Sequence, residues 1–501
     1  MILRLYSYAL LFGFILFNIT IYANIIPLYH EEPRRALVAY EMLLSKNFIV
    51  PTILQETYLK KPPFHNVLIA LTSLGDKYIS NVEARLPSIL SYILLCISIF
   101  FTPVSKREGI TASIYLLLSY SFLFSYGFKA EPDMLFTTLI FLSFLFYIKK
   151  DRLVYLFISS LFMSLSILTK GISVLFFYPP MLFYIIYYEK NKTKNLKLLL
   201  MHFMLSLLLP AVWLVLLSFH TNLTALIKSS YNEIFLRGTI DYKNYIVHLL
   251  IFPFRAIMAT LPISLLFIFA FKKQNIKKDK LYRCSILFFL WIFFLIWLYP
   301  SGRGRYFLPA IPFFCILATY HVDTEKYFNL TLRKAILIIF AVLLIIAIPF
   351  DLYNQFYIQA LAFMLTLIFI LYYYNKPALP LLKETILLVS IYVVIFFHGP
   401  FLYKTKAYYN YDKHFTHVVN KWNNNKLPIY FDNTTKDDLK LAFFVTRTTQ
   451  QHIGVLHNEK RNKYYLVSYK NYTNCSVLDR IDYKPKTRKS LHNTLTIYQC
   501  N

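Results

Sequence analysis

The chain has 501 residues, of which 57% are hydrophobic and 16% are charged, and its formal net charge is +28. Soluble globular proteins contain about 45–50% apolar and about 25% charged residues, so this composition excludes an ordinary soluble protein. The basic excess does not indicate nucleic-acid binding, because no base-reading motif accompanies the basic runs.

Apolar runs recur along most of the chain at lengths that cross a bilayer. A transmembrane helix needs about 20 apolar residues, and we expect about thirteen such helices. The first run could be a cleaved signal peptide, but its length favours an uncleaved span. The expected spans are 7–28, 86–104, 110–127, 132–148, 153–168, 171–188, 198–218, 250–271, 281–299, 305–321, 332–350, 355–374 and 384–399.

Lysine and arginine concentrate in alternate connections between these spans. A Lys/Arg excess marks cytoplasmic loops, so we expect these connections and the N-terminus inside the cell. They are 105–109, 149–152, 189–197, 271–283 and 332–334. The opposite set is 29–85, 126–133, 169–171, 219–249, 299–306 and the tail from residue 400. Charges in the second set break the positive-inside pattern, which indicates binding or chemistry on the outer face.

Two parts outside the spans have structure of their own. In segment 29–85, "RRALVAYEMLLS" and "FHNVLIALTSLG" are spaced as short amphipathic helices that lie along the membrane surface. Short alternating runs in residues 400–501 predict a small α/β or β-rich domain. The predicted fold is therefore an all-α polytopic membrane domain, residues 1–399, followed by a small C-terminal extracytoplasmic α/β domain.

The cysteines divide between these two parts. Cys96, Cys284 and Cys315 lie in apolar runs, where we expect them to be inert packing residues. Cys475 and Cys500 lie in the polar tail. If that tail is extracytoplasmic, the two could form a disulfide.

The outer face carries carboxylates at two membrane entrances. Glu31 and Glu32 follow the first span, and Asp133 opens another span directly after Pro132. A carboxylate at a bilayer entrance is costly unless it has a partner or a water-filled cavity. Solvated loop residues, or helix capping by Asp133, are the alternatives that the sequence leaves open.

Cations and a phenol accompany these carboxylates on the same face. Lys61 is held in an extended segment by Pro62 and Pro63, while Arg237 and Tyr306 lie in other outer connections. Each alone could be an interfacial anchor. Together they suit a phosphate at headgroup depth, because hydrogen bonds to a charged phosphate are strong. Carboxylates beside a phosphate clamp fit sugar transfer from a lipid phosphate.

These motifs resemble, in order, those of the GT-C glycosyltransferases that take a sugar from polyprenyl phosphate. The aminoarabinose lipid A transferases are the most similar branch, and the protein O-mannosyltransferases are more distant. The acidic pair with arginine, "FIVP", "KPP" and "ARLPS" follow the family's order within residues 27–90. "EPDM", "LTKG" and "RYFLPAIP" match later family segments.

The resemblance also implies roles for individual residues. Glu31 takes the place of the family's first-loop catalytic carboxylate, which is usually Asp, and Asp133 takes the second acidic position. Lys61, Arg237 and Tyr306 would bind the donor phosphate. Lys60 stands where relatives often have an acid. We expect the further substrate contacts to come from Glu32, Arg34, Arg35, Lys60 and Arg303.

The implied reaction transfers a sugar from polyprenyl (undecaprenyl) phosphate on the periplasmic face of a bacterial inner membrane. Lipid A is the favoured acceptor, and 4-amino-4-deoxy-L-arabinose is one candidate sugar; a protein or surface-glycan hydroxyl is the alternative acceptor. The expected partners are the donor lipid, the acceptor and membrane lipids. Neither a metal nor a further cofactor is indicated. A transporter or flippase is disfavoured, since the chain has only 10 Gly and no repeated halves.

Overall fold

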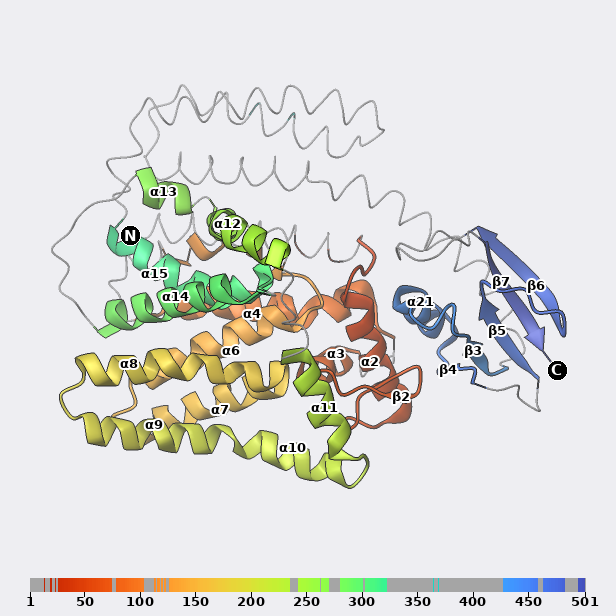
Figure 1. Ribbon diagram of the computed structural model, residues 1–501, viewed down its shortest axis with the longest axis horizontal. Helices are drawn as coiled ribbons and strands as arrows, with labels where there is room; N and C mark the ends of the chain where they lie inside the picture. The colour runs from red at the N-terminus through yellow and green to blue at the C-terminus, as the bar shows by residue number, and fades with distance from the viewer. Residues whose placement is uncertain are drawn as a thin grey trace.

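The computed structural model shows a helical bundle with a small mixed sheet at one end (Figure 1). It describes residues 26–73, 78–102, 126–234, 242–261, 263–269, 280–300, 302–321, 427–457, 463–482 and 494–500, and isolated positions at 13, 19, 23, 112–113, 115–117, 119, 121–122, 364 and 368. The predicted spans 7–28, 332–350, 355–374 and 384–399 therefore lie wholly or largely outside the described residues, and 110–127 is described only in part.

Within the described residues, four helical stretches are long and apolar enough to cross a membrane. They are Asn81–Phe100, Leu153–Tyr188, Lys192–Ser218 and Lys280–Leu298, and Pro132–Tyr147 is a shorter apolar helix. Each overlaps one or two spans that the apolar runs predict, so the prediction of a multi-helical membrane protein is confirmed.

The centre of the bundle contains α4 (Asn81–Phe100), α6 (Pro132–Tyr147) and α7 (Leu153–Lys170). The start of α4 is fixed by a capping box, in which Ser80 accepts from the Glu83 amide and Glu83 accepts from the Ser80 amide. A proline at the first position of α6 suits a helix start, because the missing amide proton has no partner there. These starts place charged residues at one end of the bundle.

The chain reverses direction after α7. Gly171 has φ of 75° and opens the 3-10 helix η2 (Gly171–Phe177), which leads into α8 (Tyr178–Tyr188). Lys150 Nζ lies 2.9 Å from Glu189 Oε1 and so joins the start of α7 to the end of α8. A straight helix of 36 residues would hold those ends about 54 Å apart. The predicted connection at 169–171 is thus confirmed as a turn between two antiparallel segments.

The remaining described helices complete the bundle. The predicted span 198–218 is formed by two consecutive helices, and 250–271 is interrupted between Ala259 and Ile263. The predicted span 305–321 begins as a 3-10 helix. Their bounds are α9 (Lys192–Ser206), α10 (Leu208–Ser218), α11 (Leu223–Ile234), α12 (Tyr242–Ala259), α13 (Ile263–Phe269), α14 (Lys280–Leu298), η4 (Gly304–Ala310) and α15 (Ile311–His321).

A buried polar chain ties α6 to α9 inside the bundle. Ser159 Oγ donates to the Ser143 carbonyl and lies 2.9 Å from His202 Nε2. The hydroxyl of Tyr178 lies 3.3 Å from His202 Nδ1 and 2.9 Å from Ser206 Oγ. Side-chain hydrogen bonds between membrane helices are worth about 0.6–2 kcal/mol each, so this chain helps to hold the four helices in register.

The first loop folds as two helices and a hairpin: α2 (Glu32–Ser45), β1 (Thr52–Ile53), β2 (Glu56–Thr57) and α3 (Phe64–Thr72). The buried Glu41 carboxylate accepts hydrogen bonds from Thr52, Leu54 and Gln55, and so fastens the hairpin to α2. The two predicted short helices are confirmed. Most of α2 is buried, because it packs between α3 and the C-terminal domain.

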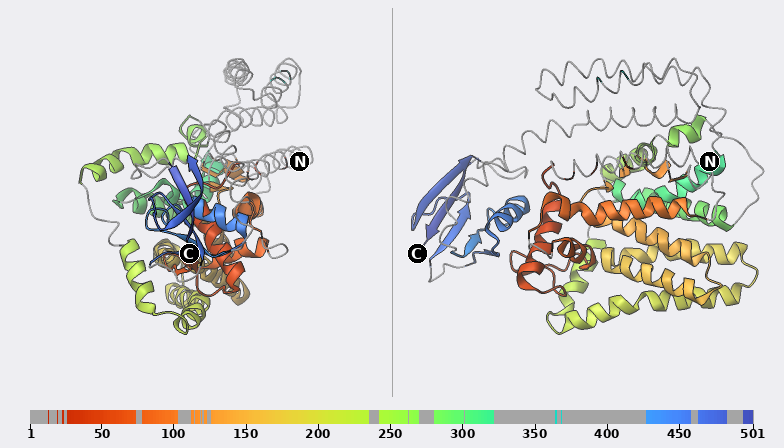
Figure 2. Two further views of the ribbon diagram at one scale, coloured as in Figure 1. Left: turned by 90° about the vertical axis from the view of Figure 1, so that its right-hand side faces the viewer. Right: turned by 180° about the vertical axis from the view of Figure 1, so that it is seen from behind.

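The C-terminal domain is a five-stranded mixed sheet with one described helix, α21 (Leu439–Thr449). The strand order is β4-β3-β5-β7-β6. Strand β3 is parallel to its two neighbours, β4 and β5. Strand β7 is antiparallel to its two neighbours, β5 and β6. Helix α21 lies between the sheet and α2 (Figure 2). The strands are β3 (Ile429–Phe431), β4 (Ile453–Val455), β5 (Tyr464–Ser468), β6 (Cys475–Asp482) and β7 (Thr494–Cys500). The predicted α/β character is confirmed.

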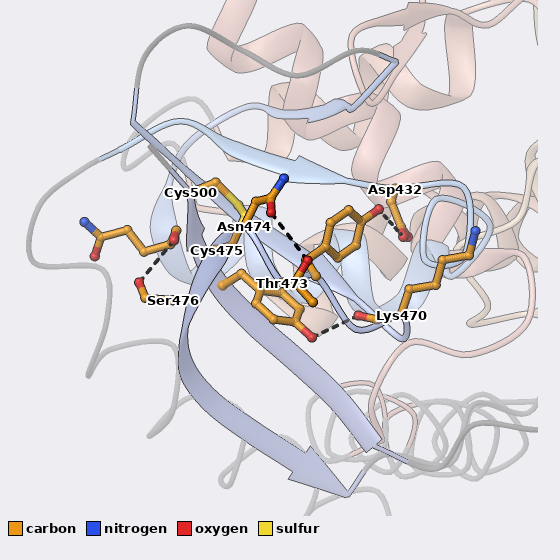
Figure 3. Close-up of a disulfide and its surroundings, with 10 residues drawn as sticks. Asp432, Lys470, Thr473, Asn474, Cys475, Ser476 and Cys500 are labelled. Carbon is orange, nitrogen blue, oxygen red and sulfur yellow. Dashed lines mark hydrogen bonds between the residues drawn. A yellow bond between two sulfur atoms is a disulfide. The ribbon is translucent and has the colours of Figure 1, made fainter.

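A disulfide joins Cys475 to Cys500 across the neighbouring strands β6 and β7 (Figure 3). The structure thus decides a question that the sequence left open. Cys96, Cys284 and Cys315 are buried and form no disulfide, as their apolar surroundings indicate.

Replacing both Cys475 and Cys500 by serine is expected to destabilise the C-terminal domain by about 3 kcal/mol, because the bond closes a loop between residues 25 apart. Thermal unfolding and limited proteolysis of the purified chain measure this loss. The matched control is Cys284→Ser, which removes a thiol but no crosslink. Equal stability of the double variant and an oxidised wild type would contradict the expectation.

Asp432 organises the loop that follows β3. Its carboxylate accepts hydrogen bonds from Ser468 Oγ at 2.6 Å, the Thr434 amide at 2.9 Å and Tyr472 Oη at 3.1 Å. Burial opposes ionisation, but these bonds, led by that from Ser468, outweigh it and lower the pKa of Asp432. A lowered folded-state pKa contributes stability at neutral pH that is lost as the pH falls below about 4.

Asp432→Asn should therefore lower the melting temperature of the domain at pH 7 and have a smaller effect near pH 3. The amide can accept only part of this hydrogen-bond set, so we expect a loss of about 1–3 kcal/mol at neutral pH. Melting curves of wild type and variant across this pH range test the sign. A pH-independent difference would rule out the ionised carboxylate as its source.

Candidate active site

Asp133 is a buried carboxylate at the entrance of the bundle. It lies in the first turn of α6 with an exposed fraction of 2%, and its Oδ1 lies 2.6 Å from Nζ of Lys170. Lys170 is the last residue of α7, and its ammonium also lies over the ring of Tyr306 at 5.4 Å. Glu131 occupies the N-cap position of α6, and its side chain accepts no capping hydrogen bond. The carboxylate of Asp133 is therefore paired with a cation, as its burial requires.

A second ion pair adjoins the first. Glu131 Oε2 lies 2.9 Å from Arg305 Nη1, and the glutamate side chain is 5% exposed. Burial, and then the neighbouring Asp133 carboxylate, raise the pKa of Glu131. Arg305 interacts electrostatically with both carboxylates. We call Glu131, Asp133, Lys170 and Arg305 the ion cluster; it draws charges from three separate segments to one end of the bundle.

Glu31 lies directly before α2 and forms an ion pair with Arg34 one turn later. Both side chains are about one-third exposed, at 33% and 29%. Among the described residues, the Glu31 carboxylate has no other hydrogen-bond partner. An exposed pair of this kind is held weakly, so Glu31 can exchange its partner for a substrate.

Glu32 is engaged quite differently. Its two oxygens each lie 2.8 Å from Arg85, at Nε and Nη2, and both side chains are fully buried. The same carboxylate accepts from the amides of Ala130 and Tyr29, and Arg85 donates to the carbonyl of Pro27. This pair joins α2, α4 and the start of the α6 segment. The geometry favours a structural role for Glu32 over the predicted substrate contact.

The other predicted substrate residues surround the ion cluster. Lys61 is half-buried and interacts electrostatically with Asp133, and Pro63, two residues later, occupies the N-cap position of α3. Tyr306 is half-buried beside Arg305, and Lys60 is exposed. Arg303 is also exposed, Arg35 is buried on α2, and Arg237 lies outside the described residues. Lys61, Tyr306 and Asp133 are thus brought to one end of the bundle.

Sequence reasoning missed Glu131, Lys170, Arg305 and Arg85. All four lie in the stretches that carry the resemblance, which are "EPDM", "LTKG", "RYFLPAIP" and "ARLPS". Each is a charge at the edge of an apolar run, a signal that indicates a buried partner. The sequence does not show which charges meet, because the pairs are up to 174 residues apart.

Among the described residues, no group of three or more His, Cys, Asp or Glu side chains is placed to hold a metal ion. The carboxylates of the ion cluster are instead paired with the cations Lys170 and Arg305. This arrangement can bind an anionic group through Lys61 and orient a polar one through the carboxylates.

Comparison with known proteins supports a relationship to lipid-linked sugar transfer. Residues 60–215 match the family model described as dolichyl-phosphate-mannose-protein mannosyltransferase. The chain is similar to the GT-C glycosyltransferases in this segment. A comparison with curated protein sequences finds no match.

Solved structures extend the similarity to nearly the whole chain. The crystal structure of ArnT from Cupriavidus metallidurans in the apo state is 15% identical, covers 98% of this chain and 97% of its own, and has a TM-score of 0.69. The structure of the same protein bound to undecaprenyl phosphate has the same identity and coverage, with a TM-score of 0.71. These structures confirm the expected fold, and the family match over residues 60–215 bears out the expected class, a glycosyltransferase.

Proposed function

We propose that this protein transfers a sugar from undecaprenyl phosphate to an extracytoplasmic acceptor, with lipid A the favoured acceptor. The observation that carries the proposal is the buried Asp133–Lys170 pair, which lies at the same end of the bundle as Lys61 and Tyr306. A relative of the same fold has been solved with undecaprenyl phosphate bound. This arrangement supplies both a cationic site for the lipid phosphate and fixed carboxylates for the sugar.

The donor phosphate is assigned to Lys61, Tyr306 and Arg237. Breaking the bond between the anomeric carbon and the phosphate oxygen leaves the electron pair on the lipid phosphate. A preorganised cation stabilises that developing charge by several kcal/mol. Lys61 sits in a segment stiffened by two prolines, which reduces the cost of holding the ammonium in place.

The two proposed catalytic carboxylates have different environments. Asp133 is locked by Lys170, so it orients the sugar and adds a fixed negative charge near the anomeric carbon. Glu31 is about one-third exposed and is paired with Arg34 in a weakly held ion pair, so it can exchange that partner for the acceptor. With a hydroxyl acceptor, the acceptor oxygen bonds to the anomeric carbon and its proton passes to Glu31.

The acceptor's charge decides whether that proton transfer is needed. A lipid A phosphate is already anionic and would attack without a base, with Arg34 and the exposed Arg303 available as cations. A protein or surface-glycan hydroxyl is the second candidate, because the partly exposed Glu31 carboxylate is held in an ion pair that can exchange its partner. The exposed cations Lys60 and Arg303 weigh toward the anionic acceptor.

We further propose a bacterial inner-membrane location with the site and the C-terminal domain in the periplasm. The Cys475–Cys500 disulfide supports this placement, since disulfides persist in oxidising compartments. The basic residues Lys150 and Lys280 lie together near Glu189 at the end of the bundle opposite the ion cluster. An excess of such residues is typical of the cytoplasmic side.

Mass spectrometry of lipid A and of polyprenyl-phosphate sugars, in a deletion strain complemented with wild type, Glu31→Ala or Lys61→Ala, tests the proposal. Loss of one sugar from lipid A that only wild type restores is the expected result. Unchanged lipid A with accumulation of the lipid-linked sugar would move the acceptor to a protein or another glycan. No change in either pool would overturn the assignment.

A further inference from the structure

A second polar group lies beside the ion cluster and takes no part in the steps above. It consists of Arg35 on α2 and of His65 and Asn66 in the first turn of α3, and we call it the Arg35–His65 cluster. The exposed fractions are 6%, 2% and 1%. His65 is close enough to interact electrostatically with both Arg35 and Asp133. The cluster is therefore a buried neighbour of the proposed catalytic carboxylate.

Four polar atoms of this cluster have no hydrogen-bond partner in the described part of the chain. They are Nε of Arg35, Nδ1 and Nε2 of His65, and Oδ1 of Asn66. The Arg35 guanidinium makes one long bond, 3.4 Å to the hydroxyl of Tyr58. The Asn66 side chain lies close enough to the His65 ring to favour its protonated form. The geometry nevertheless gives no regular hydrogen bond between Asn66 Oδ1 and either ring nitrogen. An unsatisfied buried polar group costs about 1–3 kcal/mol, and native proteins retain few of them.

The protonation state of His65 defines what the cluster can bind. Burial, and then the positive charge of Arg35, lower the pKa of His65 to about 3. The imidazole is thus neutral at physiological pH and offers one N–H donor and one nitrogen acceptor. Arg35 Nε adds a second donor, and Asn66 Oδ1 adds a second acceptor. The four atoms therefore comprise two donors and two acceptors.

This inventory distinguishes between ligand classes. A phosphate or carboxylate accepts hydrogen bonds only, so it would satisfy the two donors and leave both acceptors unmatched. A hydroxyl group both donates and accepts. Two adjacent hydroxyls of a sugar ring can satisfy all four atoms.

We infer that the Arg35–His65 cluster is a subsite for the hydroxyl groups of a sugar ring, next to Asp133. The inference rests on the proposed function and deepens it, because it assigns sugar recognition to residues other than the phosphate-binding set. The sugar belongs either to the donor lipid or to the acceptor glycan, and the chemistry of recognition is the same.

The four atoms are enclosed by protein in this conformation, so a sugar reaches them only when neighbouring side chains move. No hydrogen bond to any of these four atoms has to be broken when those side chains move. The binding of a hydroxylated ligand then supplies hydrogen bonds that the closed cluster lacks. A site that specifically hydrogen-bonds a substrate hydroxyl discriminates strongly against a ligand without it.

The test uses the purified full chain in nanodiscs, with undecaprenyl phosphate and with undecaprenyl phosphate carrying glucose, mannose or 4-amino-4-deoxy-L-arabinose as probes. Wild type should bind at least one sugar-bearing lipid more tightly than the bare one. His65→Phe and Arg35→Met should each reduce that preference about tenfold and leave affinity for undecaprenyl phosphate unchanged. His65→Gln, which keeps a donor and an acceptor, should retain part of it.

The matched control is His202→Phe, which removes a buried histidine whose ring nitrogens already have partners. It should lower thermal stability without changing the ratio of the two affinities. A second outcome is that the Arg35 and His65 variants keep the wild-type preference for sugar-bearing over bare undecaprenyl phosphate but bind lipid A in nanodiscs about tenfold more weakly. That result would assign the recognised sugar to the acceptor. If neither affinity changes, the inference is wrong. If wild type binds neither undecaprenyl lipid, the proposed function fails instead.

Discussion

Asp133→Asn is expected to reduce sugar transfer by about 10²–10⁴-fold, because it removes a fixed negative charge beside the reacting sugar. The substitution also leaves Lys170 as a buried cation without its 2.6 Å partner, so some loss of stability should accompany the loss of activity. Transfer is measured as the modified product that mass spectrometry identifies in complemented cells, normalised to the amount of protein in the membrane.

A second substitution separates the chemical role of Asp133 from its structural one. Lys170→Gln alone leaves the carboxylate unpaired, whereas Asp133→Asn combined with Lys170→Gln removes both charges. The double variant should recover most of the lost stability, since neither group then carries an uncompensated buried charge. We expect its activity to stay low. Recovery of activity together with stability would show that Asp133 serves only to neutralise Lys170.

The helical part of the fold was predictable because its signal is local. Runs of apolar residues of membrane-crossing length identify α4, α7 and α14 within a few residues, since lipid requires each backbone to satisfy its hydrogen bonds internally. The interruption between α12 and α13 and the 3-10 helix η4 at the start of the span 305–321 were not predicted. Hydropathy measures only composition, and such interruptions depend on packing against neighbouring helices.

The candidate site was predictable in its parts and not in its pairings. The positions of Asp133 and Lys61 follow from charges at membrane entrances and from the family's motif order. The pairing of Glu131 with Arg305 depends on how α6 and η4 pack, which no local pattern encodes. From their positions in the sequence, Glu31 and Glu32 were both expected to face the substrate, Glu31 as a catalytic carboxylate and Glu32 as a substrate contact. Packing separates them, because one faces solvent and the other is buried beside Arg85.

The position of the C-terminal domain has a consequence for the site. Its core is continuous with that of α2, through residues such as Phe444 on α21 and Leu37 on α2, and Arg447 donates to Asn81 at the start of α4. Helix α2 carries Arg34 and follows directly after Glu31. The domain therefore braces the segment that presents the proposed base, a role that the alternating pattern of the tail does not reveal.

Breaking the Glu32–Arg85 pair is expected to cause the largest loss of stability of any single substitution considered for this chain. Glu32→Gln or Arg85→Met leaves a fully buried charge without its partner, which costs about 3–5 kcal/mol. Removing both charges together should cost less than the sum of the two single losses. The melting temperatures of the four proteins in detergent give this coupling as a double-mutant cycle.

The same cycle decides between the two roles considered for Glu32. A structural role requires strong coupling to Arg85 and similar destabilisation by either single substitution. A substrate contact would instead leave Glu32→Gln close to wild type in melting temperature while weakening transfer. The buried, bidentate geometry and the two additional backbone amides predict the first result, because four donors already occupy this carboxylate and hold the loop that positions Glu31.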